Sequence, residues 1–185
     1  TITVNRGKRT GKRRLFAKSQ HFTGQILLRT GTNTQEGDYQ SMSYRIFQNK
    51  TVLITGHTGF KGSWLSMWLK SLGAKVIGVA LDPPSQPSHF EVAGLAEILE
   101  DHRLDIRDGS ALKSLVSQIQ PDFVFHLAAK ALVRESYNDP IVTYQTNVLG
   151  TLNLLEALRP LKTKCTCILI TSDKCYENVE WVWGY

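Results

Sequence analysis

The chain has 185 residues, of which 42% are hydrophobic, so it is long enough to bury the core of one domain. Its formal net charge of +6 is uneven: residues 1–41 hold eight basic and two acidic side chains, whereas residues 42–185 hold fourteen of each sign. The charge therefore gives no reason to expect nucleic acid as a partner of the folded part. No apolar run approaches the roughly 20 residues that cross a bilayer, so no membrane partner is expected either.

The segment 1–44 lacks a sustained period of 2 or 3.6 residues and is rich in Thr, Gly, Arg and Lys. This composition predicts a basic, disordered leader ahead of one domain at 45–185. Met42 lies a few residues before the first expected strand, and we expect the native start there. An organelle transit peptide and the basic arm of a nucleic-acid-binding protein are the alternatives for this segment.

From Lys50 onward, short apolar runs alternate with segments of helical period. This alternation predicts an α/β fold, a Rossmann-type doubly wound parallel sheet with helices on both faces. The expected strands are 51–55, 76–81, 103–106, 123–128 and 166–171. The expected helices are one around 64–72, a short one ending near 99, one that Asp108 caps and Pro121 ends, and a long one over 140–158.

A glycine-rich segment, Gly56-His57-Thr58-Gly59-Phe60-Lys61-Gly62, joins the first expected strand to the first long helix. In a dinucleotide-binding turn the first glycine permits a tight turn, the second lets the backbone approach a pyrophosphate, and the third lets helix and strand pack closely. The helix N-terminus then offers free N–H groups to the phosphates. We therefore expect an NAD(P) site that uses Gly56, Thr58, Gly59, Phe60 and Gly62. The alternative is a purely structural turn.

Three cysteines lie close together, at Cys165, Cys167 and Cys175. Their odd number, and the lack of a CxxC pair or of histidines at metal-ligand spacing, predict reduced thiols without a metal site. Reduced thiols are typical of a cytoplasmic protein.

The spacing GxxGxxG resembles the extended short-chain dehydrogenase/reductase family. Within that resemblance, Asp105-Ile106 corresponds to the pair that meets the adenine ring, Leu127-Ala128-Ala129 to the turn under the nicotinamide ribose, and Asn147 to a structural asparagine. A strand end with a capping acid, a turn made by packing alone and an exposed helix residue are the respective alternatives. The acid expected after the second strand falls on Ala80, with Asp82 two residues later, so NAD rather than NADP follows from the resemblance alone.

Further segments resemble the sugar-nucleotide 4,6-dehydratases of that family: 57–66, 132–137, 171–176 and 181–185. The resemblance implies an internal redox dehydration with NAD as cofactor and a nucleotide sugar as substrate. It places Ser172 at the sugar C4 oxygen and Asp173 as the acid that protonates the departing C6 hydroxyl. Lys174 follows where most relatives carry glutamate, which points to the branch that acts on CDP-glucose. The alternative for Asp173 and Lys174 is a surface ion pair.

The Tyr-x-x-x-Lys pair on which the family's hydride chemistry depends is absent from this sequence. We therefore expect the NAD-binding portion of a longer enzyme, incomplete at its C-terminal side, which is inactive alone and forms a homo-oligomer at full length. A sugar-nucleotide epimerase, a non-catalytic NAD(P)-binding regulator and a nucleic-acid binder that uses the basic leader are the competing hypotheses.

Overall fold

The computed structural model describes residues 45–173 and 176–184. The expected leader, Lys174 and Cys175 lie outside the described residues. Five parallel strands form one sheet in the order β3-β2-β1-β4-β5. Their bounds are Thr51–Thr55 for β1, Lys75–Ala80 for β2, Glu100–Arg103 for β3, Phe123–His126 for β4 and Thr166–Leu169 for β5. This is the strand order of the Rossmann fold, and the predicted α/β class is confirmed.

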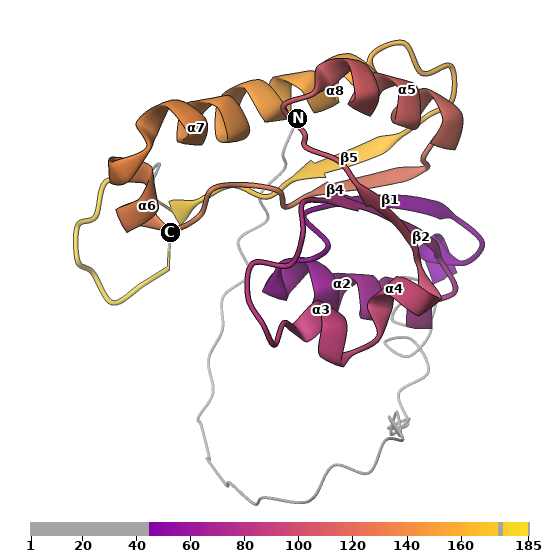
Figure 1. The fold of residues 1–185 in the computed structure, drawn as a ribbon, viewed down its shortest axis with the longest axis horizontal. Coiled ribbons are helices and arrows are strands. Elements are labelled where there is room, and N and C mark those ends of the chain that lie inside the picture. Colours follow the sequence, from indigo (N-terminus) through magenta and orange to yellow (C-terminus); the bar gives the residue numbers. More distant parts are fainter. Residues whose placement is uncertain (1–44, 174–175, 185) are drawn as a thin grey trace, which may run out of the picture.

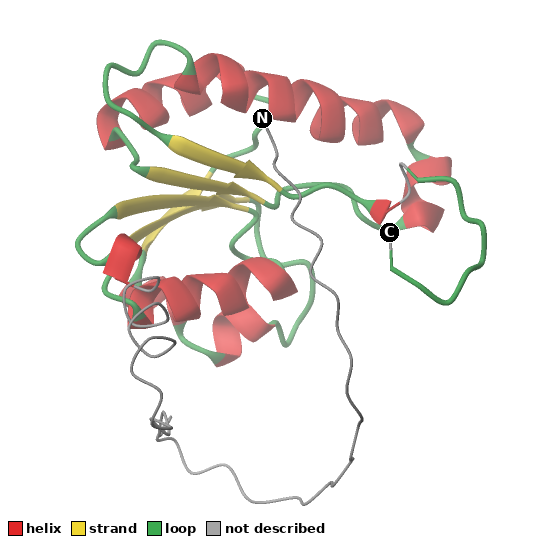
Figure 2. Cartoon of the chain, turned by 180° about the vertical axis from the view of Figure 1, so that it is seen from behind, coloured by secondary structure: helices red, strands yellow, loops and turns green. Residues whose placement is uncertain are grey.

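Helices cover both faces of the sheet (Figure 1). One layer consists of α2 (Phe60–Ser71), α3 (His89–Val92) and α4 (Leu95–Ile98). The other consists of α5 (Gly109–Ile119), α7 (Pro140–Tyr144), the π-helical segment η2 (Gln145–Gly150) and α8 (Thr151–Leu158), of which the last three run on as one rod. A short 3-10 turn, η1 (Arg45–Phe47), precedes β1, and α6 (Val133–Asn138) follows the loop after β4. Figure 2 shows the sheet lying between the two helical layers.

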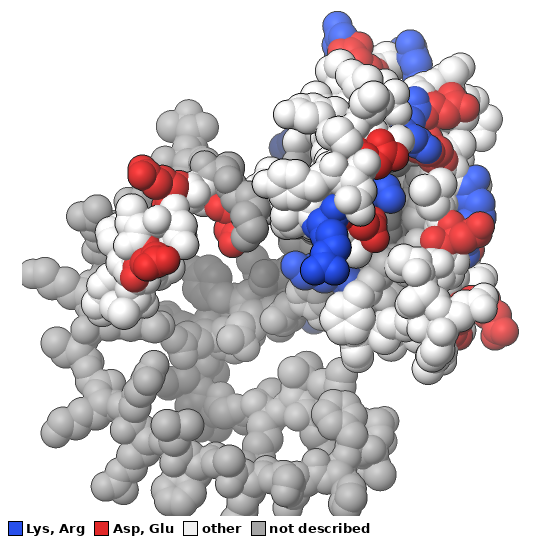
Figure 3. Space-filling model, turned by 60° about the vertical axis from the view of Figure 1, so that its left-hand side comes forward, with Lys and Arg blue, Asp and Glu red and all other residues white. Residues whose placement is uncertain are grey.

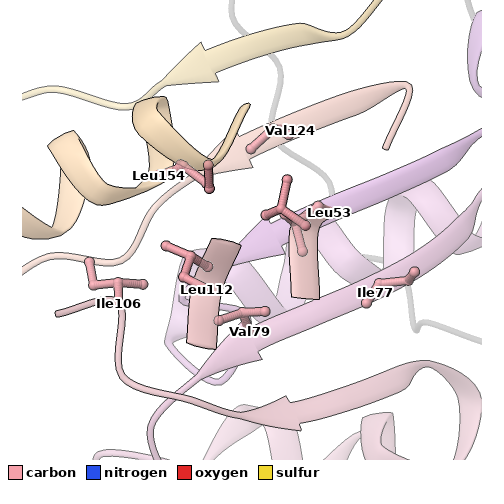
Figure 4. Packing of buried hydrophobic residues seen from close by; sticks show 9 residues of the cluster. Leu53, Ile77, Val79, Ile106, Leu112, Val124 and Leu154 are labelled. Atoms are coloured by element: carbon pink, nitrogen blue, oxygen red, sulfur yellow. The ribbon is translucent and has the colours of Figure 1, made fainter. Parts of the chain in front are cut away.

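The alternating sides of β1 serve two hydrophobic cores. Val52 and Ile54 pack on the α2 side with Leu69, whereas Leu53 packs on the other side with the apolar face of α5 and α8. Figure 4 shows that second cluster, in which Leu154 of α8 lies over the strands. Burial of β1 on both faces explains why its sequence is a continuous apolar run rather than an alternating one.

We predict that Leu154→Ala lowers the free energy of unfolding by about 2–5 kcal/mol, because it removes a fully buried side chain and leaves a cavity. Leu155 is the matched control on the same helix, since its side chain is 41% exposed. Leu155→Ala is expected to cost less than about 1 kcal/mol. Urea unfolding of both variants measures the difference, and equal losses would contradict this description of the core.

Several predicted elements need correction. The third strand lies at Glu100–Arg103, not at 103–106, because β2 pairs with Glu100 through Arg103 and the apolar residues that suggested a strand belong to the following loop. The fourth and fifth strands end at His126 and Leu169, two residues earlier than expected. Within the predicted helix 140–158 the backbone takes a π-helical turn, and α6 was not predicted.

Basic and acidic side chains of the described residues are interspersed on the face shown in Figure 3. That mixture agrees with the even balance of charges over residues 42–185. Among the helices of the described part, none carries an apolar stretch long enough to cross a bilayer.

Candidate dinucleotide site

The turn between β1 and α2 depends on close contacts between backbone atoms. Gly56 has a φ of 78°, in the left-handed region, and its N–H donates to the carbonyl of Val79 at 2.7 Å. A Cβ on Gly62 would lie 2.1 Å from the carbonyl oxygen of Gly56, and a Cβ on Gly56 would lie 2.8 Å from the backbone nitrogen of Ala128. The turn therefore excludes side chains at both positions.

The N-terminus of α2 is open to an anion. Gly59 is the N-cap residue and has no side chain to accept the first N–H groups of this twelve-residue helix. Those N–H groups, together with the positive end of the helix dipole, suit a pyrophosphate. Thr58 donates its hydroxyl to the carbonyl of Leu81 at 3.0 Å, which ties the turn to the end of β2, and Phe60 is largely exposed.

The loop after β3 holds the first of the pairs expected at the cofactor. The Asp105 carboxylate accepts from the backbone N–H of Arg107 at 2.9 Å and from its guanidinium at 2.5 and 2.8 Å. These hydrogen bonds hold the pKa of Asp105 below its usual range. Ile106 is buried in the core against Gly150, so its backbone, not its side chain, is the part that can meet a ligand.

Sequence analysis missed Asn153, which holds this loop from α8. Its side-chain amide donates to the carbonyls of Ile106 and Arg107 at 3.1 and 3.0 Å. A cavity of about 540 Å³ lies beside it, lined by Asp105, Arg107, Asp108, Gln145, Leu149 and Asn153. Sequence gave no signal for this contact, because the partners lie more than forty residues apart.

The loop after β4 contains Leu127, Ala128 and Ala129 and runs directly beside the glycine turn. The N–H of Ala128 donates to the Thr55 hydroxyl at 3.2 Å. Further along, the Asn147 side chain accepts from the N–H of Lys130 at 2.8 Å and donates to its carbonyl at 3.1 Å. Asn147 thus anchors the loop rather than standing free on the helix surface.

The expected catalytic pair lies just beyond β5. Ser172 and Asp173 are exposed, and the Ser172 hydroxyl donates to the Asp173 carboxylate at 3.3 Å. β4 and β5 are parallel neighbours, and the N–H of Ile170 donates to the His126 carbonyl at 3.0 Å. The segment that carries Ser172 therefore leaves the sheet at the same edge as the loop after β4.

The end of β2 carries a cation that sequence analysis did not expect. The Arg103 guanidinium, from β3, donates to the Leu81 carbonyl at 2.9 Å and to Asp101 at 2.7 Å, and it lies 3.9 Å from the exposed Asp82 carboxylate. Pairing of β2 with β3 brings Arg103 there, although more than twenty residues separate it from β2. Asp82 and Arg103 therefore lie together just after the carboxyl end of β2, where an acidic residue meets the cofactor ribose in many Rossmann folds.

Two of the three cysteines fall within the described residues, and they form no metal-ligand cluster there. Cys165 and Cys167 are free cysteines, and burial raises the pKa of both thiols. Within residues 45–173 and 176–184, no group of three or more metal-ligating side chains gathers at one place.

Two buried histidines lie under the site. The Nε2 atom of His57, in the glycine turn, lies 2.8 Å from the Asp101 carboxylate, and His126 at the end of β4 lies between two threonine hydroxyls. Burial lowers the pKa of both side chains below the ordinary value of 6.5. Both are therefore neutral in the folded chain near neutral pH.

We predict that the chain becomes less stable as the pH falls below about 6.5, because unfolding then lets His57 and His126 bind protons that the fold excludes. The stabilising contribution is complete above the unfolded pKa and is lost as the pH falls toward the lower folded pKa. Denaturant unfolding between about pH 7.5 and 5.5 should show a declining free energy of unfolding. His126→Gln should reduce the slope, and an unchanged slope would contradict the assignment.

Comparison with known proteins places this geometry in a family. The family model described as GDP-mannose 4,6 dehydratase matches residues 53–182, which include the turn, both loops and the segment after β5. The chain belongs to the GDP-mannose 4,6-dehydratase family. Among curated proteins, the CDP-glucose 4,6-dehydratase of Salmonella typhimurium is 53% identical over 139 residues, which cover 75% of this chain and 39% of that enzyme.

Other similar proteins include epimerases. The CDP-paratose 2-epimerase of Salmonella typhi is 33% identical over 70% of this chain and 38% of its own length. The solved UDP-glucose-4-epimerase of Stenotrophomonas maltophila, with bound NAD and formylated UDP-arabinopyranose, is 25% identical with a TM-score of 0.64, over 72% of this chain and 40% of that one. The Bordetella bronchiseptica enzyme WbmF, in complex with NAD+ and UDP, is 27% identical with a TM-score of 0.57, over 68% and 36%. The chain thus spans about two fifths of the length of these relatives.

Proposed function

We propose that the chain is the NAD-binding portion of a sugar-nucleotide 4,6-dehydratase whose substrate is CDP-glucose and whose product is CDP-4-keto-6-deoxyglucose. The observation that carries this proposal is the 53% identity to a CDP-glucose 4,6-dehydratase. The identity to the epimerases, 33% and 32%, is much lower. The Asp173-Lys174 pair supports the same choice, because protonation of a departing hydroxyl has no place in epimerisation.

The residues present fit a dinucleotide. The space between Gly56 and Gly62 admits no Cβ, and the open N-terminus of α2 suits a diphosphate. In our proposal the turn holds the pyrophosphate, Asp105 and the Ile106 backbone meet the adenine, and the loop of Leu127, Ala128 and Ala129 lies beneath the nicotinamide ribose. NAD, when bound, supplies an acceptor for hydride that can also return it.

Residues at the end of β5 take part in the sugar chemistry in this proposal. The Ser172 hydroxyl donates a hydrogen bond to the sugar C4 oxygen. Once C4 has been oxidised to a ketone, this hydrogen bond polarises the C4 carbonyl. The Asp173 carboxyl gives its proton to the departing C6 hydroxyl. Lys174, which is outside the described residues, stands beside that acid in the sequence and supplies a positive charge.

An exposed apolar stripe supports homo-oligomeric assembly of the full-length enzyme. Tyr144, Val148 and Leu152 recur every four residues along α7, η2 and α8, and each is at least half exposed. A stripe of this kind on a long helix is typical of an interface with another copy.

We predict that NAD raises the thermal stability of the 185-residue chain. NAD at 100 times its Kd should add about 2.7 kcal/mol to the free energy of unfolding, since the ligand binds only the folded state. Thermal unfolding with and without NAD measures this, and CMP is the control ligand. No effect of saturating NAD would contradict the cofactor assignment.

Incubation with NAD and CDP-glucose tests the catalytic part of the proposal. The chain contains no Tyr-x-x-x-Lys pair to take the C4 hydroxyl proton, so we expect no 4-keto-6-deoxy product from the chain alone. Product formed by the purified 185-residue chain would contradict this expectation. In a full-length enzyme that forms product, Asp173→Asn should abolish dehydration, whereas a regulator would show neither activity nor this sensitivity.

A further inference from the structure

A series of hydrogen bonds beneath the loop after β4 connects the end of β1, through the end of β4, to α8 and η2. The Thr55 hydroxyl, at the end of β1, lies 2.6 Å from Nδ1 of His126, at the end of β4. Nε2 of the same ring lies 2.9 Å from the hydroxyl of Thr151 in α8, and that hydroxyl donates to the Asn147 carbonyl at 2.7 Å. Thr55 and His126 are buried, so water does not replace these partners.

One set of donors and acceptors is consistent along this series of hydrogen bonds. In that set Thr151 gives its one hydroxyl hydrogen to the Asn147 carbonyl and accepts from His126, whose Nε2 then carries the proton. The Thr55 hydroxyl accepts from the N–H of Ala128 at 3.2 Å and is free to donate to Nδ1. The consistent arrangement is a neutral His126 with the proton on Nε2. Burial, which lowers the pKa of this ring, favours the same neutral form.

The residues at the two ends of this series of hydrogen bonds, Thr55 and Asn147, hold the same loop. Thr55 binds the N–H of Ala128, and the Asn147 side chain binds both the N–H and the carbonyl of Lys130. His126 and Thr151 join these two anchors, through the Thr55 hydroxyl at one end and the backbone carbonyl of Asn147 at the other. The loop between Ala128 and Lys130 is thereby fixed at two points relative to the glycine turn.

We propose that His126 and Thr151 are positioning residues, which set the loop of Leu127, Ala128 and Ala129 at the height needed by the nicotinamide half of the cofactor. This inference rests on the proposed NAD function. It assigns a role to two residues that touch neither cofactor nor substrate. The adenine half meets a different loop, which Asn153 holds independently.

The test uses the 185-residue chain, with Thr151→Val to remove the hydroxyl at constant shape and Thr151→Ser to restore it. Loss of this partly buried hydrogen bond should weaken NAD binding about three- to tenfold. ADP, which lacks the nicotinamide half, should bind Thr151→Val and the unaltered chain within about twofold of each other, and Thr151→Ser should recover NAD affinity. ¹⁵N NMR of the unaltered chain should show His126 as the neutral Nε2–H tautomer, a readout that needs no variant to fold.

The outcomes separate the two proposals. Failure of the unaltered chain to bind NAD overturns the proposed function and the positioning role with it. Binding of NAD together with an Nδ1–H tautomer, or equal weakening of NAD and ADP in Thr151→Val, overturns the positioning role alone.

Discussion

Gly62→Ala is expected to abolish measurable NAD binding and to destabilise the chain by about 1–3 kcal/mol or more. The new Cβ would lie 2.1 Å from the Gly56 carbonyl oxygen and 2.8 Å from the His57 Cα. These are backbone atoms, so no rotation of a side chain can relieve the overlap. Relief requires α2 to move away from the turn, which displaces the N–H groups that would bind the pyrophosphate.

Two other glycines provide graded controls for this variant. A Cβ on Gly59 would lie 3.3 Å from the Gly56 carbonyl oxygen, and the φ of −73° at Gly59 suits alanine, so Gly59→Ala should weaken NAD binding only moderately. Nothing lies within 4 Å of a Cβ on Gly184, so Gly184→Ala should behave as the unaltered chain. Isothermal titration with NAD ranks the three variants. Retention of full NAD affinity by Gly62→Ala would contradict the role assigned to the turn.

The sequence predicted the parts of the fold whose physical requirements are local. β1 is a buried apolar run followed at once by a glycine turn, and both features depend on residues adjacent in the chain. β3 was misplaced because an edge strand tolerates charge: its four residues are Glu100, Asp101, His102 and Arg103, which carry no apolar pattern. The π-helical turn around Asn147 was missed, since the hydrophobic spacing of the helix is the same on both sides of it.

The motifs of the candidate site could be proposed from the sequence, but the residues that hold its loops in place could not. Asp105 and Asn147 were identified by resemblance, whereas Asn153 and Arg103 act through contacts between segments distant in sequence. Such contacts depend on strand order and on helix placement, which no local pattern encodes. The sequence also gave no role to His57 within the glycine turn, although in the structure its ring is fully buried.

Burial of His57 leads to the second large effect, which we expect from Gly78→Ala. A Cβ on Gly78, in the middle of β2, would lie 2.3 Å from Cγ and 2.4 Å from Cδ2 of the His57 ring. The ring cannot move aside freely, because Nε2 is bound to Asp101 and the Phe90 ring packs against it edge-on with a centroid separation of 5.3 Å. We expect a loss of about 3 kcal/mol or more in the free energy of unfolding, together with weaker NAD binding.

The double variant His57→Ala/Gly78→Ala distinguishes this overlap from a general intolerance of β2 to alanine. His57→Ala alone leaves a cavity and removes one of the two partners of the Asp101 carboxylate, the other being Arg103, which should cost about 2–4 kcal/mol. In the double variant the new methyl group occupies part of that cavity. Its loss of unfolding free energy should therefore be smaller than the sum of the losses in the two single variants, by about 1–3 kcal/mol. Urea unfolding of the four chains completes the cycle. Additive losses would show that the His57 ring and Gly78 are not coupled, and the turn would then owe its position to the glycines alone.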